Sequence, residues 1–259
     1  MKKTLFILLT ASALCLAVCK TEPDLPADPH VPLVNPFVGV WRATTGGQYW
    51  EFRPDGTGGK AASADGPFGD SFSFFVYAGQ DVRTAPKSGS LLLLEDSTND
   101  SVSVTRYTFS SATEYWATLT PVTGGENILL ERESVNTQVL NVANSLVGEW
   151  SASWSWPGGD HDYGTWSLKY RADGTLRLYH HQVQHQFENA YALRKNTLVI
   201  FGDMRFSSPQ TVNSEVIVVT AVTAGITPLG NGQWHVQETQ STPGPANWTY
   251  TKVNAAKWK

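Results

Sequence analysis

The chain of 259 residues contains two copies of one sequence pattern, and this internal repeat constrains the fold more than any other feature. An Asn-Pro-Phe-Val-Gly-Val-Trp segment ends at Trp41, and a related Asn-Ser-Leu-Val-Gly-Glu-Trp segment ends at Trp150, 150 − 41 = 109 residues later. An Arg-x-Asp-Gly-Thr segment ends at Thr57 and again at Thr175, 175 − 57 = 118 residues later. A third match, also 118 residues apart, joins 130–136 to 248–254. Three collinear matches predict a tandem duplication, with 118 − 109 = 9 additional residues between the Trp and the Asp-Gly turn of the second copy.

Each copy alternates short runs of β-branched and aromatic residues with Gly, Asn, Asp and Pro, a pattern typical of antiparallel strands joined by tight turns. Closing eight sequential strands into a barrel removes the exposed edges of an open sheet. The sequence therefore predicts an all-β fold of two tandem antiparallel eight-stranded up-and-down barrels. The expected strands lie near 38–44, 48–53, 57–62, 71–78, 90–95, 102–109, 114–120 and 127–133, and near 147–155, 163–171, 174–184, 187–194, 197–202, 214–222, 233–239 and 247–252.

The two copies are joined by a segment with a different pattern. Apolar residues recur at helical spacing between Val139 and Leu146, although Val and Asn are weak helix formers. We therefore expect 136–146 to form a short helix or turn. We therefore predict four parts of the chain: a signal peptide over 1–19, a Pro-rich tether over 20–34, a first barrel domain over 35–135 and a second over 136–259.

The N-terminal segment is a predicted export signal. Lys2 and Lys3 precede an apolar run from Leu5 to Val18, which is 14 residues long, whereas a spanning helix needs about 20. The sequence Leu-Ala-Val-Cys ending at Cys19 resembles the lipobox of bacterial lipoproteins, which implies that Cys19 is acylated and becomes the new N-terminus. The resemblance implies a lipid-anchored protein of the bacterial cell envelope, at the outer membrane or the periplasmic face. The alternative is an ordinary secretory signal with incidental cysteines.

The residues after Cys19 form a predicted spacer. Proline recurs every three or four positions from Pro23 to Pro36, which favours an extended polyproline-II conformation. Such a spacer would hold the folded domains away from the bilayer. A Pro-rich recognition motif is the alternative interpretation.

The motif that opens each copy resembles the first signature of the lipocalins. Phe37-x-Gly39-x-Trp41 and a Leu-x-Gly-x-Trp segment ending at Trp150 both match its Phe-x-Gly-x-Trp pattern. The resemblance implies two lipocalin-like domains in which Trp41 and Trp150 close the narrow end of a barrel. Eight strands leave an interior that side chains either fill or share with one small ligand.

An excess of tryptophan marks the start of the second copy. Trp150, Trp154 and Trp156 share one face of an expected strand, and Trp166 lies on the next. The stripe is either the interior of a barrel or a binding wall for an apolar ligand or sugar rings. We take Trp154, Trp156 and Trp166 as the candidate ligand-binding residues, because they flank the inserted segment at one end of the barrel.

The histidines do not make a predicted metal site. His180 and His181 would point to opposite faces of a strand, and His181 and His185 would lie about 13 Å apart at roughly 3.3 Å per residue. Zinc requires all its ligands within about 2.1 Å of one ion. We expect no metal and no cofactor.

Composition excludes further classes of function. There are 19 basic and 23 acidic residues and no cationic block, so no nucleic-acid partner is expected. No nucleophile elbow, phosphate-binding loop or paired carboxylate pattern occurs, and we expect the protein not to be an enzyme. The favoured interpretation is an envelope lipoprotein that binds a small hydrophobic or amphipathic ligand in a lipocalin-like barrel. The alternative is a non-enzymatic scaffold or adhesion lipoprotein that acts through protein or glycan contacts on the barrel surface, with a partner that the sequence does not identify.

Overall fold

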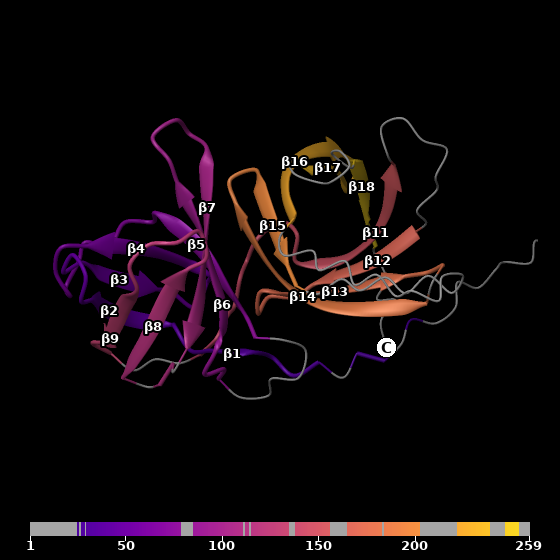
Figure 1. Cartoon of the computed structure of the whole chain (residues 1–259). Helices are drawn as coiled ribbons and strands as arrows, with labels where there is room; N and C mark the ends of the chain where they lie inside the picture. The colour runs from indigo at the N-terminus through magenta and orange to yellow at the C-terminus, as the bar shows by residue number, and fades with distance from the viewer. Residues whose placement is uncertain are drawn as a thin grey trace, which may run out of the picture.

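The computed structural model describes residues 25, 27–28, 30–78, 85–110, 112–113, 115–134, 138–155, 165–182, 184–202, 222–238 and 247–253. This part of the chain folds into two closed antiparallel barrels and a two-stranded sheet, and it contains no helix (Figure 1). Within the same ranges there is consequently no helix of the length and hydropathy needed to cross a membrane. The predicted all-β class with two eight-stranded barrels is confirmed.

Both barrels are simple meanders in which each strand pairs with the next and the last pairs with the first. The first barrel consists of β2 (Gly39–Ala43), β3 (Tyr49–Phe52), β4 (Thr57–Ala61), β5 (Phe72–Tyr77), β6 (Gly89–Asp96), β7 (Val102–Ser110), β8 (Trp116–Pro121) and β9 (Ile128–Arg132). The second consists of β11 (Gly148–Ser155), β12 (Thr165–Tyr170), β13 (Thr175–His180), β14 (His185–Arg194), β15 (Thr197–Phe201), β16 (Val222–Gly230), β17 (Gln233–Glu238) and β18 (Asn247–Lys252). β1 (Val34–Asn35) pairs with β10 (Gln138–Val139) beside them.

The motif that opens each copy makes the same contacts in both barrels. The indole Nε1 of Trp41 donates to the carbonyl of Phe37 at 2.6 Å, and that of Trp150 donates to the carbonyl of Leu146 at 2.7 Å. Both tryptophans are buried, and a cation from the closing strand lies over each ring: Arg132 over Trp41 and Lys252 over Trp150. The tryptophan of the duplicated motif therefore has the same packing role in both barrels.

The Asp-Gly turns are also equivalent. Oδ1 of Asp55 accepts from the backbone N and the hydroxyl of Thr57 at 2.9 and 2.7 Å, and Asp173 makes the same pair to Thr175 at 3.1 and 2.6 Å. The glycine that follows each aspartate has a φ near +80°, a conformation that glycine adopts without steric cost. These turns fix the register of β3–β4 and of β12–β13.

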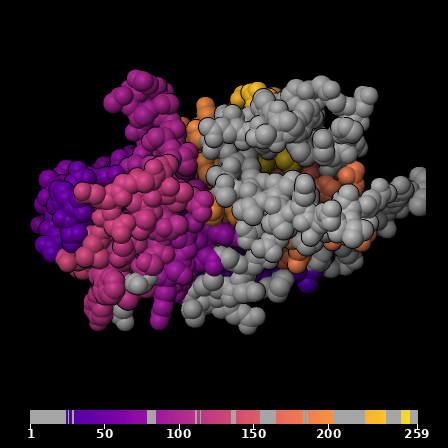
Figure 2. Space-filling view, viewed as in Figure 1, coloured from indigo at the N-terminus to yellow at the C-terminus, as the bar shows by residue number. Residues whose placement is uncertain are grey.

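The barrels pack against each other through the outer faces of β5, β6, β14 and β15 (Figures 1 and 2). β6 carries four consecutive leucines because Leu91 and Leu93 face the first interior, whereas Leu92 and Leu94 face the second barrel. The ring of Phe201 meets Tyr77 at 5.2 Å, and Arg194 bridges to Asp96 at 2.6 Å. The two barrels therefore share a buried apolar interface with an ionic border.

Two expectations about local structure were wrong or incomplete. Residues 138–146 form no helix, and of the expected helix or turn only a turn at 145–146 is present. Between β10 and this turn the chain is irregular, and Asn141 N donates to Pro54 O and Val142 N to Ala172 O, at 2.7 and 2.6 Å. The two Asp-Gly turns thus supply hydrogen bonds that a helix would otherwise provide. β16 at 222–230 was not predicted, because Gly and Pro228 interrupt its pattern, and the strand expected over 214–222 lies almost entirely outside the described residues.

Candidate functional site

The two ends of the second barrel differ in their connections. The turns 171–174, 195–196 and 231–232 lie at one end, which we call the β12–β13 end. The turn 181–184 lies at the other, the β13–β14 end. Alternation of strand direction also places the last residues of β11, β15 and β17 and the first residues of β12, β16 and β18 at the β13–β14 end.

An aromatic group lines the interior toward the β13–β14 end. Trp166 of β12 is buried, and its ring lies 4.3 Å from that of His180, 5.8 Å from Trp248 and 6.2 Å from Phe187. His181 lies on the opposite face, where its Nε2 is 2.8 Å from Oγ of Ser167. The alternation expected for the two neighbouring histidines is therefore present.

The structure places the sequence-predicted residues as follows. Trp166 lies in the aromatic group. The backbone of Trp154 pairs with Trp248 in the register of β11 with β18, which puts it on the strand face that Trp150 shares, and its side chain is outside the description. Trp156 and Cys19 lie outside the described residues.

Asn189 is a site residue that sequence reasoning missed. It lies on β14 between Phe187 and Tyr191, whose side chains belong to the interior cluster, so its amide also faces inward. Asn189 is 3% exposed, and among the residues that the structure describes neither Nδ2 nor Oδ1 has a hydrogen-bond partner. The amide of Asn189 lies against Gly202: a Cβ added at Gly202 would be 2.1 Å from Oδ1 of Asn189.

The corresponding place in the first barrel is apolar. Phe74 N donates to Gly56 O, and Tyr191 N donates to Gly174 O, both at 2.9 Å, which makes Phe74 the equivalent of Tyr191. Asn189 lies two residues before Tyr191, and Phe72 lies two residues before Phe74, so Phe72 is the equivalent of Asn189. Phe72 is fully buried among aromatic rings. The second copy thus has a buried amide where the first has a phenyl ring.

Tyrosines form the polar layer nearer the β12–β13 end. Tyr170 donates from its hydroxyl to that of Tyr250 at 3.1 Å, and Tyr191 donates to the carbonyl of Arg171 at 2.9 Å. Burial raises the pKa of Tyr170 and of Tyr191 well above the ordinary value, so both are neutral donors. This layer is satisfied by its own hydrogen bonds, in contrast to Asn189.

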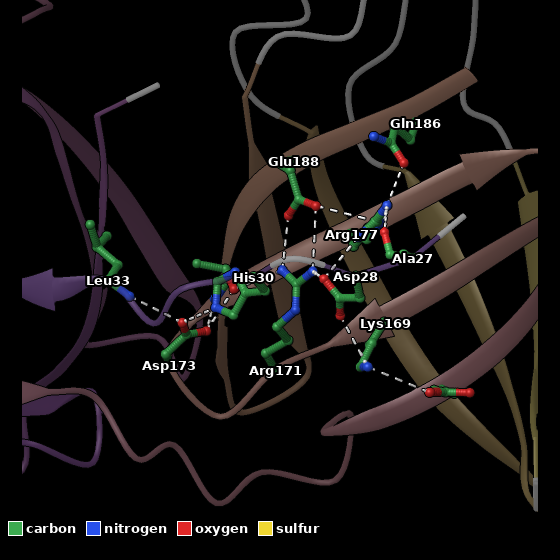
Figure 3. A network of polar contacts seen from close by, with 12 residues as sticks. Ala27, Asp28, His30, Leu33, Lys169, Arg171, Asp173, Arg177, Gln186 and Glu188 are labelled. Carbon is green, nitrogen blue, oxygen red and sulfur yellow. Dashed lines mark hydrogen bonds and ion pairs between the residues drawn. The ribbon is translucent and has the colours of Figure 1, made fainter. Parts of the chain in front are cut away.

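The outer face of the second barrel holds a separate polar network (Figure 3). A strap consisting of Leu25, Ala27, Asp28 and residues 30–35 crosses β12 and β13. Asp28 accepts from Arg171, Arg177 and Lys169 at 2.7, 2.8 and 3.0 Å. Burial alone raises the pKa of Asp28, but these three cations outweigh it and hold that pKa well below its usual range.

The strap ends at the Asp-Gly turn of the second barrel. His30 Nε2 lies 2.6 Å from Oδ2 of Asp173, and the backbone N of Leu33 donates to the same oxygen at 3.3 Å. Burial raises the pKa of Asp173, whereas the hydrogen bonds from His30 and Thr175 lower it, and the net shift is downward. The described part of the expected Pro-rich spacer is therefore bound to a barrel rather than free of it.

Comparison with known proteins yields one structural likeness. The chain is similar to Burkholderia oklahomensis agglutinin at 10% sequence identity, with 86% of this chain and 84% of that chain covered and a TM-score of 0.19. No protein-family model and no curated protein matches. At this TM-score the likeness transfers neither fold nor function, and the site is interpreted from its own residues.

Proposed function

We propose that this chain is a membrane-anchored envelope lipoprotein that binds a small amphipathic molecule inside its second, lipocalin-like barrel. The apolar part of the molecule contacts Trp166, Phe187 and Trp248, and a polar group meets the amide of Asn189. The proposed role is non-catalytic binding, and the lipid anchor is at Cys19.

The unpartnered amide of Asn189 is the observation that carries this proposal. Leaving a buried polar group without a partner costs about 1–3 kcal/mol. A ligand that donates to Oδ1 or accepts from Nδ2 would recover that free energy, whereas a purely apolar ligand would not. The ligand class is therefore apolar with at least one hydrogen-bonding group, such as a hydroxyl or carbonyl.

The contrast between the two barrels supports the second as the binding barrel. The first interior is packed with phenyl and indole rings around Phe52, Phe72 and Phe74, at centroid distances from 4.9 to 6.4 Å. The second carries a polar group at the place of Phe72. Binding in the second barrel also agrees with its additional residues between β11 and β12.

The proposal is tested on the mature chain purified from its own envelope. Native mass spectrometry should show one additional small mass that organic solvent extracts, and Asn189→Leu should lose it. Trp50→Phe is the control, because Trp50 is a buried interior residue whose Nε1, like the amide of Asn189, lacks a partner in the described residues, but it lies in the first barrel. A chain that carries no small molecule in any form would contradict ligand binding and favour the scaffold or adhesion alternative.

A further inference from the structure

The strap has a defined direction along the second barrel. Leu25 packs on Tyr179 near the β13–β14 end. Arg177, two residues before Tyr179 on β13, contacts Ala27 O and Asp28. His30 contacts Asp173 at the β12–β13 end. The chain therefore runs antiparallel to β13 before it enters the first barrel, and in Figure 1 this indigo segment passes beneath the second barrel.

The strap is held by buried contacts. The side chain of Arg177 is 1% exposed and that of Asp28 is 8% exposed. Arg171 is shared between Asp28 and Glu188, with Nη1 2.8 Å from Oε2 of Glu188 (Figure 3). These contacts fix the position of Leu25 relative to the ends of the barrel.

The acylation site lies close to Leu25 in the sequence. Cys19 precedes Leu25 by 25 − 19 = 6 residues, which span at most about 20 Å when extended. Tyr179 is only two residues from the turn 181–184, so the near end of the barrel needs little of this reach. To reach the β12–β13 end, the segment from Cys19 to Leu25 would have to run back alongside the strap, which would use nearly all of its length.

We propose that the strap orients the second barrel with its β13–β14 end toward the bilayer. This inference rests on the proposed function, because it requires the anchor at Cys19. The partner of this end is a phospholipid surface, and the aromatic group of Trp166, Phe187 and Trp248 lies in the half of the barrel interior nearer that surface, from which a membrane-derived amphiphile would arrive. The substrate class is therefore a molecule dissolved in the membrane rather than in the aqueous phase.

The test uses the acylated mature protein, which begins at Cys19, in vesicles of phosphatidylethanolamine and phosphatidylglycerol that contain a headgroup-spin-labelled phospholipid. Of the two cysteines, Cys15 lies in the predicted signal and Cys19 is acylated, so an introduced cysteine is the only free thiol. Gln182→Cys and Asn196→Cys place a fluorophore in exposed turns at opposite ends of the same barrel. The spin label should quench the fluorophore at 182 and leave that at 196 unquenched.

Two variants separate the strap from the anchor. Inserting about twenty Gly and Ser residues between Lys20 and Thr21 adds roughly 25 Å of mean reach and should abolish the quenching at 182 without touching a strap contact. Asp28→Ala should reduce the difference in quenching between the fluorophores at 182 and 196, and Asp28→Glu should restore that difference. The insertion variant and both Asp28 variants should still float with the vesicles.

The outcomes distinguish this inference from the proposed function. Equal quenching at 182 and 196, or stronger quenching at 196, overturns the orientation even if a ligand co-purifies. Quenching confined to 182 in a protein that carries no ligand supports the orientation and contradicts the ligand-binding function. Absence of acylation at Cys19 overturns the orientation together with the anchor.

Discussion

At the scale of single residues, one difference between the two barrel interiors carries the proposed site. Phe72 fills the interior of the first, whereas Asn189 places an amide in the interior of the second. An interior without function would gain stability by exchanging that amide for an apolar side chain. Its presence is therefore interpreted as a site for the polar group of a ligand.

Asn189→Leu should raise the free energy of unfolding of the ligand-free protein by about 1 kcal/mol, because it removes a buried polar group without a partner. The same variant should lose binding. Urea denaturation of delipidated protein measures the first effect, and native mass spectrometry measures the second. A destabilised Asn189→Leu protein would show that the amide has a structural role.

Asp28 gives the strap a pH-dependent stability. Folding holds its pKa below the ordinary value of 3.8, so its contribution is fully present above about pH 4–5 and is lost as the pH falls through the lower folded-state pKa. Asp28→Asn should therefore lower the free energy of unfolding by about 3 kcal/mol at neutral pH, the usual cost of breaking a buried ion pair.

Urea titrations of the wild type and Asp28→Asn at a series of pH values check this dependence. The difference in the free energy of unfolding between the two proteins should stay constant down to about pH 4–5 and then shrink. The exposed Asp65 supplies the control, since Asp65→Asn should change little at any pH. A difference that grows on acidification would contradict the network in Figure 3.

At the scale of elements, the duplicated turns join the barrels to the segment between them. An added Cβ at Gly56 would lie 2.9 Å from Val142, and one at Gly174 would lie 3.4 Å from Leu140. Both turns also accept the hydrogen bonds that hold 141–142, through the carbonyls of Pro54 and Ala172. The turns therefore place one barrel relative to the other as well as fixing strand register.

Gly174→Ala should lower the free energy of unfolding by about 1–2 kcal/mol, the cost of a left-handed conformation for a residue with a Cβ. Gly56→Ala should cost more, because its Cβ also approaches Val142. Thermal unfolding followed by circular dichroism measures both. Gly69→Ala is the control, since that position has open space and no positive φ; an equal loss at Gly69 would refute the argument.

Much of the fold could be predicted from the sequence, because the repeat and strand alternation are local patterns. The packing of Trp41 and Trp150 was expected from the resemblance of their motif to the lipocalin signature. The docking of the strap could not, since Asp28 and Arg171 are 143 residues apart and proline spacing alone indicates a free extended chain. Asn189 gave no signal either, because its equivalence to Phe72 depends on matching hydrogen bonds at the two turns.

At the scale of the whole molecule, the interface makes the barrels one unit. Phe75, Leu92 and Leu94 of the first pack on Ala192, Val199 and other apolar residues of the second. Arg194 and Lys195 add ion pairs to Asp70, Asp96 and Asp100 at the border. The two barrels thus share one apolar interface with ion pairs at its border.

Ala192→Asp should uncouple the barrels, because it buries a carboxylate in the apolar interface without altering either interior. A single cooperative urea transition in the wild type should separate into two. Thr108→Asp, on an exposed outward position of β7, should leave one transition. Two transitions already present in the wild type would contradict the coupling.

The central claim is that the amide of Asn189 receives the polar group of a ligand. The most direct measurement is a crystal structure of the mature protein purified from its own envelope without delipidation. We expect density for a small molecule among Trp166, Phe187 and Trp248, with an oxygen or nitrogen within hydrogen-bond distance of Nδ2 or Oδ1 of Asn189. An interior closed by side chains, with Asn189 bonded only to protein or water, would contradict the claim.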